Sequence, residues 1–228
     1  MATAAPEKTR VISFDRAARR VGTRYNPARN RPAPPKEWGA CAFMPSPAME
    51  AWIRATFLDV DGPLYNPDHQ HLLSAKLGVV WTGVLNNRHQ RTILATCETT
   101  KQNTSGAWKK ARAEQQLEDW FGELPDFLIT LYAPALSAFD DRSFCAVIEH
   151  ECYHAAQAKD EFGSPKFHRD GSPAFALKGH DVEEFHGVAA RYGLPADLKA
   201  LLELAQQQPQ LPDRIIEGAC GTCLARAA

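Results

Sequence analysis

The stretch Val147-Ile148-Glu149-His150-Glu151-Cys152-Tyr153-His154 decides how the rest of the chain is interpreted. Its apolar residues recur at helical spacing, so the stretch predicts an amphipathic helix. Two histidines four positions apart on a helix, here His150 and His154, stand one above the other on the same face. Neutral imidazoles in this arrangement can hold one Zn²⁺, and the carboxylate of Glu151 is within reach of a water at the open coordination position.

The residues around this motif support a helix with a core face and a separate ligand face. Asp140 and Asp141 suit an N-cap and a first turn. The apolar stripe points away from the two histidines and consists of Phe144, Val147, Ile148, Cys152 and Ala155. Cys152 is therefore interpreted as a core residue. The alternative interpretation is a surface helix that carries two solvated histidines.

A catalytic zinc site needs a third protein ligand from another part of the chain. The best candidate is His180, 26 residues after His154, at the start of a helix expected from about residue 180 to the stop at Gly193. Rival ligands in the same stretch are Glu183, Glu184 and His186, and a weaker rival in the intervening loop is His168. Asp181 and the two glutamates could instead orient a ligating ring by hydrogen bonding, or form an acidic, solvated first turn.

The two blocks together resemble a known family. The pairing of His150-Glu151-Cys152-Tyr153-His154 with Gly179-His180-Asp181-Val182-Glu183-Glu184-Phe185 is similar to that of the SprT-like metallopeptidases. The phage-type metallopeptidases are a closer match, because Arg191-Tyr192-Gly193 follows at the corresponding place. The resemblance covers residues 45–195 and implies a zincin-type fold, zinc-dependent peptidase activity and His180 as the third ligand. A longer loop before His180 and one extra residue after it leave Glu183 and Glu184 open as ligands.

The elements expected from the sequence give an α+β fold that matches zincin architecture. A helix begins at Ser46-Pro47, and its apolar positions include Met49, Trp52, Ile53 and Phe57. Residues 77–84 and 91–97 predict two strands paired across Asn86-Asn87-Arg88, residues 108–121 a helix, and residues 126–132 a third strand. We expect a small, mainly antiparallel sheet packed on the metal-binding helix, with additional helices and one sheet edge that receives substrate as an added strand.

Composition suggests three regions. Residues 1–36 hold nine Lys/Arg and two acidic residues, a net charge of +7 that leaves −8 for the remainder. With five prolines in the same stretch, residues 1–40 are predicted to form a disordered basic arm, which could contact nucleic acid through phosphates or act merely as a soluble tail. Residues 45–210 form the predicted metallopeptidase domain, in which a leucine-rich helix from Pro195 to Gln208 covers the core. Residues 211–228 form a tail.

The tail contains Cys220-Gly221-Thr222-Cys223, which is half of a zinc-ribbon pattern. Without a second pair, inert thiols are the first interpretation, and a half-site completed by Cys41 or by another chain is the alternative. Six cysteines without a recognisable secretory signal predict reduced thiols in a cytoplasm, that of a bacterial host or a phage-infected cell. No apolar run is long enough to span a membrane.

The predicted function is hydrolysis of peptide bonds by a metal-activated water, with His150, His154 and His180 as zinc ligands and Glu151 as general base. Tyr153 and Tyr192 are candidate donors to the transition state. The substrate is expected to be a protein or a peptide. Two alternatives are a catalytically silent zinc-binding adaptor and a nucleic-acid-associated phage or prophage protein.

Overall fold

The computed structural model describes residues 31–38, 41–88, 90–100, 106–180, 194, 196–207 and 219–220. The strands are β1 (Phe43–Pro45), β2 (Leu77–Thr82), β3 (Asn87–Arg88), β4 (Arg91–Thr99), β5 (Phe127–Tyr132), β6 (Ala155–Gln157), β7 (Phe175–Leu177) and β8 (Ala219–Cys220). The helices are α2 (Pro47–Ile53), α3 (Ala107–Phe121), α4 (Ala133–Leu136), α5 (Asp141–His154) and α7 (Ala196–Ala205). A π-helix, η2 (Arg54–Leu58), and a 3₁₀ helix, η3 (Pro67–Leu73), complete the described elements.

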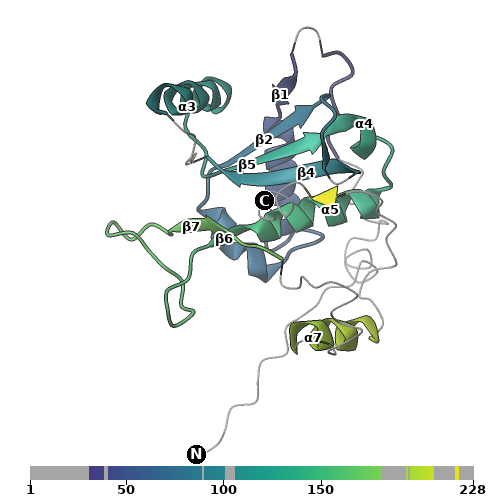
Figure 1. The fold of residues 1–228 in the computed structure, drawn as a ribbon, viewed down its shortest axis with the longest axis vertical. Coiled ribbons are helices and arrows are strands. Elements are labelled where there is room, and N and C mark those ends of the chain that lie inside the picture. Colours follow the sequence, from purple (N-terminus) through teal and green to yellow (C-terminus); the bar gives the residue numbers. More distant parts are fainter. Residues whose placement is uncertain are drawn as a thin grey trace, which may run out of the picture.

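The main sheet has the strand order β1-β2-β5-β4-β3, and β8 also pairs with β4 (Figure 1). The pairs β2–β5 and β4–β8 are parallel, whereas β1–β2, β5–β4 and β4–β3 are antiparallel. The fold is therefore α+β as expected, but the sheet is mixed.

One predicted strand pairing is wrong. Strands β2 and β4 do not form a hairpin across residues 86–88, because β5 lies between them and pairs with both. The sequence of β5 gives the physical reason: four of its six residues are buried, which suits a central strand with neighbours on both edges. Asn87 and Arg88 instead form strand β3, which pairs with the start of β4 as a short hairpin.

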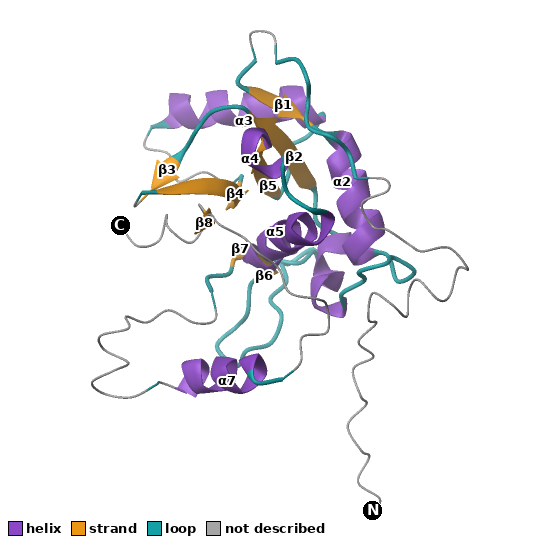
Figure 2. Cartoon of the chain, turned by 90° about the vertical axis from the view of Figure 1, so that its right-hand side faces the viewer, coloured by secondary structure: helices purple, strands orange, loops and turns teal. Residues whose placement is uncertain are grey.

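Helix α5 packs under the sheet and supplies much of the core (Figures 1 and 2). It begins at the predicted N-cap, where the Asp140 carboxylate accepts hydrogen bonds from the backbone N–H groups of Arg142 and Ser143, both at 3.0 Å. The apolar stripe is buried as predicted: Phe144, Val147, Ile148, Cys152 and Ala155 all belong to the main core. The core face and the histidine face of α5 are thus distinct.

The opposite face of the sheet is covered at one end by α3, whose Leu117 packs with Val80 and Leu128. Gly78 permits this close approach, because a Cβ at this position would lie only 2.9 Å from the Phe121 ring. Helix α3 ends at Gly122, which has φ +79°, as the sequence predicts.

The predicted role of the leucine-rich helix as a core cover is wrong for its described side chains. In α7, Leu201, Leu202 and Leu204 are all about half exposed or more. The arm at residues 1–40 and the helix expected from residue 180 to 193 fall mostly outside the described residues, so they stay predictions. None of the helices in the described part of the chain has the length and apolar content needed to cross a membrane.

Candidate metal centre

Three histidines converge at the end of α5. His150 Nε2 lies 3.2 Å from His154 Nε2 and 3.2 Å from His180 Nε2. One ligand atom from each ring can be chosen so that all three lie within 4.8 Å of one another, and within the described residues this is the one such group of His, Cys, Asp or Glu. His154 is buried, His150 is half-buried and His180 is exposed, so the cluster opens to solvent on one side.

The spacing of the nitrogens fits a zinc ion. Two nitrogens each about 2.0–2.1 Å from a tetrahedral zinc lie about 3.3–3.4 Å apart, close to the distances between the Nε2 atoms. A single proton on His150 Nε2 can form a good hydrogen bond to only one of the two neighbouring rings, those of His154 and His180. One metal ion, in contrast, can accept the lone pairs of all three rings. The donor set of three imidazoles is also one that zinc prefers.

A hydrogen bond to the backbone fixes the orientation of the His154 ring. Its Nδ1 lies 2.6 Å from the carbonyl oxygen of Lys178. Because a carbonyl can only accept, Nδ1 carries the proton and Nε2 presents its lone pair to the cluster.

The hairpin β6–β7 brings Lys178 to this position. Strand β6 follows α5 directly, and its antiparallel partner β7 leads the chain back, with Leu177 opposite Ala155. Lys178 then donates its own N–H to the carbonyl of His154 at 2.9 Å. His180 follows two residues later. The long loop between the second and third histidines is therefore ordered in part as a hairpin that delivers the third one.

Glu151 lies one residue after His150 on α5 and is only 1% exposed. Carboxylates are rarely buried to this extent unless they are paired or functional. Its neighbour Cys152 is fully buried on the core side, where desolvation raises the pKa of the thiol. Burial likewise raises the pKa of Cys145 to about 12. Both thiols are thus unreactive core groups, as predicted for Cys152.

A polar network that the sequence did not predict lies beside the cluster. The side-chain amide of Asn66 donates to Glu149 Oε1 at 2.8 Å and to the hydroxyl of Tyr153 at 2.9 Å. The Tyr153 hydroxyl in turn donates to Asp68 at 3.2 Å, and desolvation together with the nearby carboxylates raises its pKa. This network links η3 to the exposed side of α5.

Two further histidines belong to η3. His69 is fully buried, and its ring packs edge-on against that of Tyr153 with the centroids 4.5 Å apart. His71 donates from Nε2 to the carbonyl of Ala155 at 2.7 Å. The pattern Asn66-Pro67-Asp68-His69-Gln70-His71 could have signalled a capped turn rich in imidazoles, although nothing in it identifies α5 as its partner.

The other predicted site residues have different outcomes. His168 is not part of the histidine cluster. It lies in a turn closed by its own backbone bonds to Gly171 and Ser172. The remaining candidates lie outside the described residues and stay predictions: Asp181, Glu183, Glu184, His186, Tyr192 and Cys223. Cys220 is described only as part of β8, and Cys41 is exposed with a free thiol.

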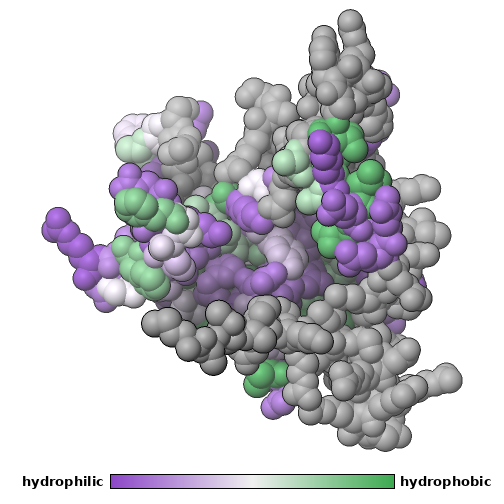
Figure 3. Space-filling model, turned by 90° about the horizontal axis from the view of Figure 1, so that it is seen from below, coloured by the Kyte–Doolittle hydropathy of each residue, from purple (hydrophilic) through white to green (hydrophobic). Residues whose placement is uncertain are grey.

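A cavity of about 600 Å³ adjoins the cluster. Its lining includes Tyr153, beside His154 in sequence, and Lys178, whose carbonyl binds the ring of His154. Seen from the α5 side of the sheet, the described surface is hollowed around a hydrophilic floor (Figure 3). Space for a ligand is thus present next to the three histidines.

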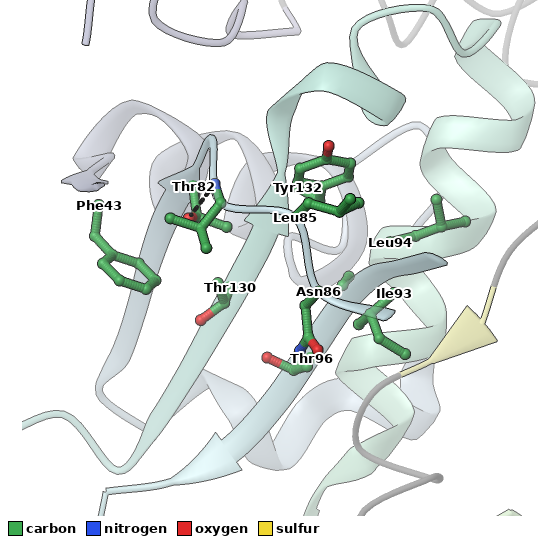
Figure 4. A pocket seen from close by; sticks show the side chains of 11 residues that line it. Phe43, Thr82, Leu85, Asn86, Ile93, Leu94, Thr96, Thr130 and Tyr132 are labelled. Carbon is green, nitrogen blue, oxygen red and sulfur yellow. Dashed lines mark hydrogen bonds between the residues drawn. The ribbon is translucent and has the colours of Figure 1, made fainter. Parts of the chain in front are cut away.

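A second hollow, of about 330 Å³, lies over the sheet face opposite α5 (Figure 4). Its walls include Phe43, Thr130 and Tyr132, and no histidine, carboxylate or lysine lines it among the described residues. The hollow beside the histidine cluster, in contrast, is lined by Asp68, His69 and His71 among other residues.

An α+β domain with three convergent imidazoles at the end of one helix belongs to the class of domains that can hold a single transition-metal ion. Residues 50–206 match the protein family described as "Putative phage metallopeptidase", and the chain belongs to this family. The resemblance seen in the sequence is thereby confirmed at the level of the phage-type family. No curated protein and no solved structure matches the chain.

Proposed function

We propose that this protein is a zinc-dependent metallopeptidase of zincin architecture, with a protein or peptide as substrate. The observation that carries the proposal is the convergence of His150, His154 and His180 with spacings that suit a tetrahedral metal ion. Membership of a metallopeptidase family supports the same conclusion. Kinship to the SprT-like enzymes is part of the proposal and rests on the sequence blocks alone.

The roles of the residues follow from their positions. When bound, a zinc ion supplies a Lewis acid that lowers the pKa of a coordinated water to about 7 and polarises the scissile carbonyl. Glu151, which follows a ligand directly and is not one itself, accepts the proton of the attacking water and passes it to the leaving amine. His154 is held in the required tautomer by Lys178.

The buried environment of Glu151 supports this role. Its side chain is only 1% exposed, so bulk water has little access to the carboxylate. The low local dielectric also strengthens its interaction with any charge that develops beside it.

We propose that an extended substrate adds as a further strand at an edge of the main sheet beside α5, with its main chain held by hydrogen bonds. Helix α5 packs against β4 of this sheet through a core that includes Leu94, Ala95 and Cys97.

Tyr153 and Tyr192 remain the proposed donors to the developing oxyanion. In this structure the Tyr153 hydroxyl donates a hydrogen bond to Asp68. Tyr153 can therefore donate to the substrate only after its hydrogen bond to Asp68 is broken.

The test is turnover of a denatured protein by zinc-loaded enzyme. Glu151→Gln should abolish cleavage while the zinc content is retained, because the general base is lost but no ligand is. Glu149→Gln is a matched control on the same helix. Its amide oxygen can still accept from Asn66, so cleavage should continue. Bound zinc without turnover of any denatured or DNA-bound protein would instead favour a silent adaptor.

A further inference from the structure

The cavity beside the histidine cluster is built from three parts of the chain. Helix η3 contributes Asp68, His69 and His71 to its lining, and α5 contributes Tyr153. Most of the remaining lining comes from the hairpin β6–β7 and the residues next to its strands. With a volume of about 600 Å³, the cavity has room for a side chain of a substrate held at the histidines. The groups on its walls therefore decide which side chain fits.

Asp68 places a negative charge on the η3 wall of this cavity. Its Oδ2 accepts a hydrogen bond from the Tyr153 hydroxyl at 3.2 Å, and its Oδ1 has no partner within the described residues. No lysine or arginine in the described part of the chain forms an ion pair with this carboxylate. The backbone N–H of Asp68 donates to the side chain of Asn66 at 3.0 Å, which fixes the residue at the start of η3. The charge is thus held in place and open to a ligand.

The other polar groups of the lining direct a ligand to the same wall. The ring of His69 is fully buried, and its Nδ1 has no hydrogen-bond partner among the residues that the structure describes. Buried polar atoms are rarely left unpaired, so one in the wall of a cavity favours a bound ligand. Lys159 and Lys178 line the cavity from the hairpin side, where their charges repel a cation. A positively charged group that enters the cavity is therefore drawn to Asp68.

We propose that the cavity binds an arginine side chain of the substrate, with Asp68 as the specificity-determining residue, and that this binding releases the hydroxyl of Tyr153. The inference rests on the proposed function and names its substrate class: protein segments with an arginine near the scissile bond. A guanidinium pairs best with a carboxylate through two parallel hydrogen bonds, one to each oxygen. Because Tyr153 donates to Oδ2 of Asp68, bidentate pairing displaces the tyrosine hydroxyl.

The released hydroxyl is a donor that stays in place. Tyr153 keeps the hydrogen bond that it accepts from the Asn66 amide at 2.9 Å and the edge-on contact of its ring with His69. Its proton, no longer shared with Asp68, can turn to the oxyanion that develops at the scissile carbonyl. A lysine is a point charge that can bind at Oδ1 alone, so it leaves the Tyr153 hydrogen bond intact. The cavity thus couples recognition of an arginine to stabilisation of the transition state.

Cleavage of matched peptides tests this proposal. The peptides carry arginine, lysine or citrulline, the neutral isostere of arginine, at each position around the cleaved bond in turn. At one such position, kcat/KM should be roughly tenfold higher with arginine than with citrulline, the effect of one charge-assisted pair. Asp68→Asn keeps the shape of the side chain and should remove this preference. Asp61→Asn, at an exposed carboxylate outside the cavity lining, is the matched control and should keep it.

Tyr153→Phe separates binding of the arginine from release of the hydroxyl. In wild type, the arginine peptide should exceed the lysine peptide in kcat as well as in affinity. Tyr153→Phe should abolish the difference in kcat and preserve the lower KM, because Asp68 is still present. An undiminished difference in kcat in Tyr153→Phe, or no difference in wild type, would overturn the release of the hydroxyl.

A binding measurement separates this proposal from the proposed function. In Glu151→Gln, fluorescence anisotropy of the labelled arginine peptide should give a Kd about tenfold lower than that of the citrulline peptide. Adding Asp68→Asn should make the two Kd values equal, whereas adding Asp61→Asn should not. Failure of every variant to cleave any substrate would contradict the peptidase function and leave this measurement intact. Equal affinity for the two peptides in Glu151→Gln would overturn the arginine site.

Discussion

The Nδ1–H of His154 donates to the carbonyl oxygen of Lys178 at 2.6 Å, and the N–H of Lys178 donates back to the carbonyl of His154 at 2.9 Å. This reciprocal pair ties the last residue of α5 to the segment that carries the third histidine. The pair orients the His154 ring, and it also positions His180, which follows Lys178 by two residues. The geometry of the cluster therefore depends on the hairpin β6–β7 as much as on α5.

The first prediction concerns the tautomer of His154. We expect the Nδ1–H form at neutral pH both with and without zinc, because the backbone acceptor is present in either state. Long-range proton–nitrogen NMR correlations of the imidazole distinguish the two tautomers directly. A proton on Nε2 in the metal-free protein would show that the Lys178 contact does not pre-orient this ring.

The second prediction concerns the pH dependence of stability at the start of α5. Hydrogen bonds from the hydroxyl and the amide of Ser143 lower the pKa of Asp140 below its ordinary value. A lowered folded-state pKa contributes stability that is fully present above the unfolded value of about 3.9 and is lost as the pH falls through the folded value. Asp140→Asn keeps the cap without titrating.

Chemical unfolding of the metal-free protein between pH 6 and pH 3 measures this effect. The advantage of wild type over Asp140→Asn should be largest at pH 6 and should shrink below about pH 4. An advantage that stays constant over this range would exclude a charged cap. Asp140→Ala should cost about 1 kcal/mol of unfolding free energy at pH 6, since no side-chain acceptor remains for the first turn.

The third prediction compares two phenylalanines in opposite environments. Phe144 on α5 is 1% exposed, packs edge-on against Trp52 and stacks with Trp81, whereas Phe162 in the loop after β6 is 84% exposed. Phe144→Ala should lower the unfolding free energy by about 3–5 kcal/mol through lost burial and the resulting cavity. Phe162→Ala should change it by no more than about 0.5 kcal/mol. Similar losses for the two variants in denaturant titrations would contradict the assignment of the core.

Local signals in the sequence predicted the elements of the fold well. The N-caps Ser46 and Asp140, the closing Gly122 and the buried face of α5 all lie where spacing and capping rules place them. The pairing of β2 with β4 was wrong because neighbouring strands in a sequence often form hairpins, and nothing local to either strand shows that β5 inserts between them.

In the site, too, local features could be predicted from the sequence and long-range contacts could not. His150, Glu151 and His154 could be predicted because their spacing along one helix is a local property, and His180 because its surrounding block resembles a known family. The Asn66–Tyr153 hydrogen bond and the Lys178 carbonyl could not be predicted. A backbone acceptor carries no sequence signal, and contacts between residues 87 positions apart depend on the tertiary fold. The exposed leucines of α7 show that an apolar pattern does not by itself specify what covers it.

The most direct test of the central claim is the zinc content of the purified protein, measured by elemental analysis after dialysis. We predict about one zinc per chain in wild type and in Glu151→Gln, and loss of that zinc in His150→Ala, His154→Ala and His180→Ala. His168→Ala, a histidine outside the cluster, should keep it. Circular dichroism would confirm that each variant is folded. Full zinc occupancy in a folded His180→Ala protein, or no zinc in wild type, would contradict the three-histidine centre.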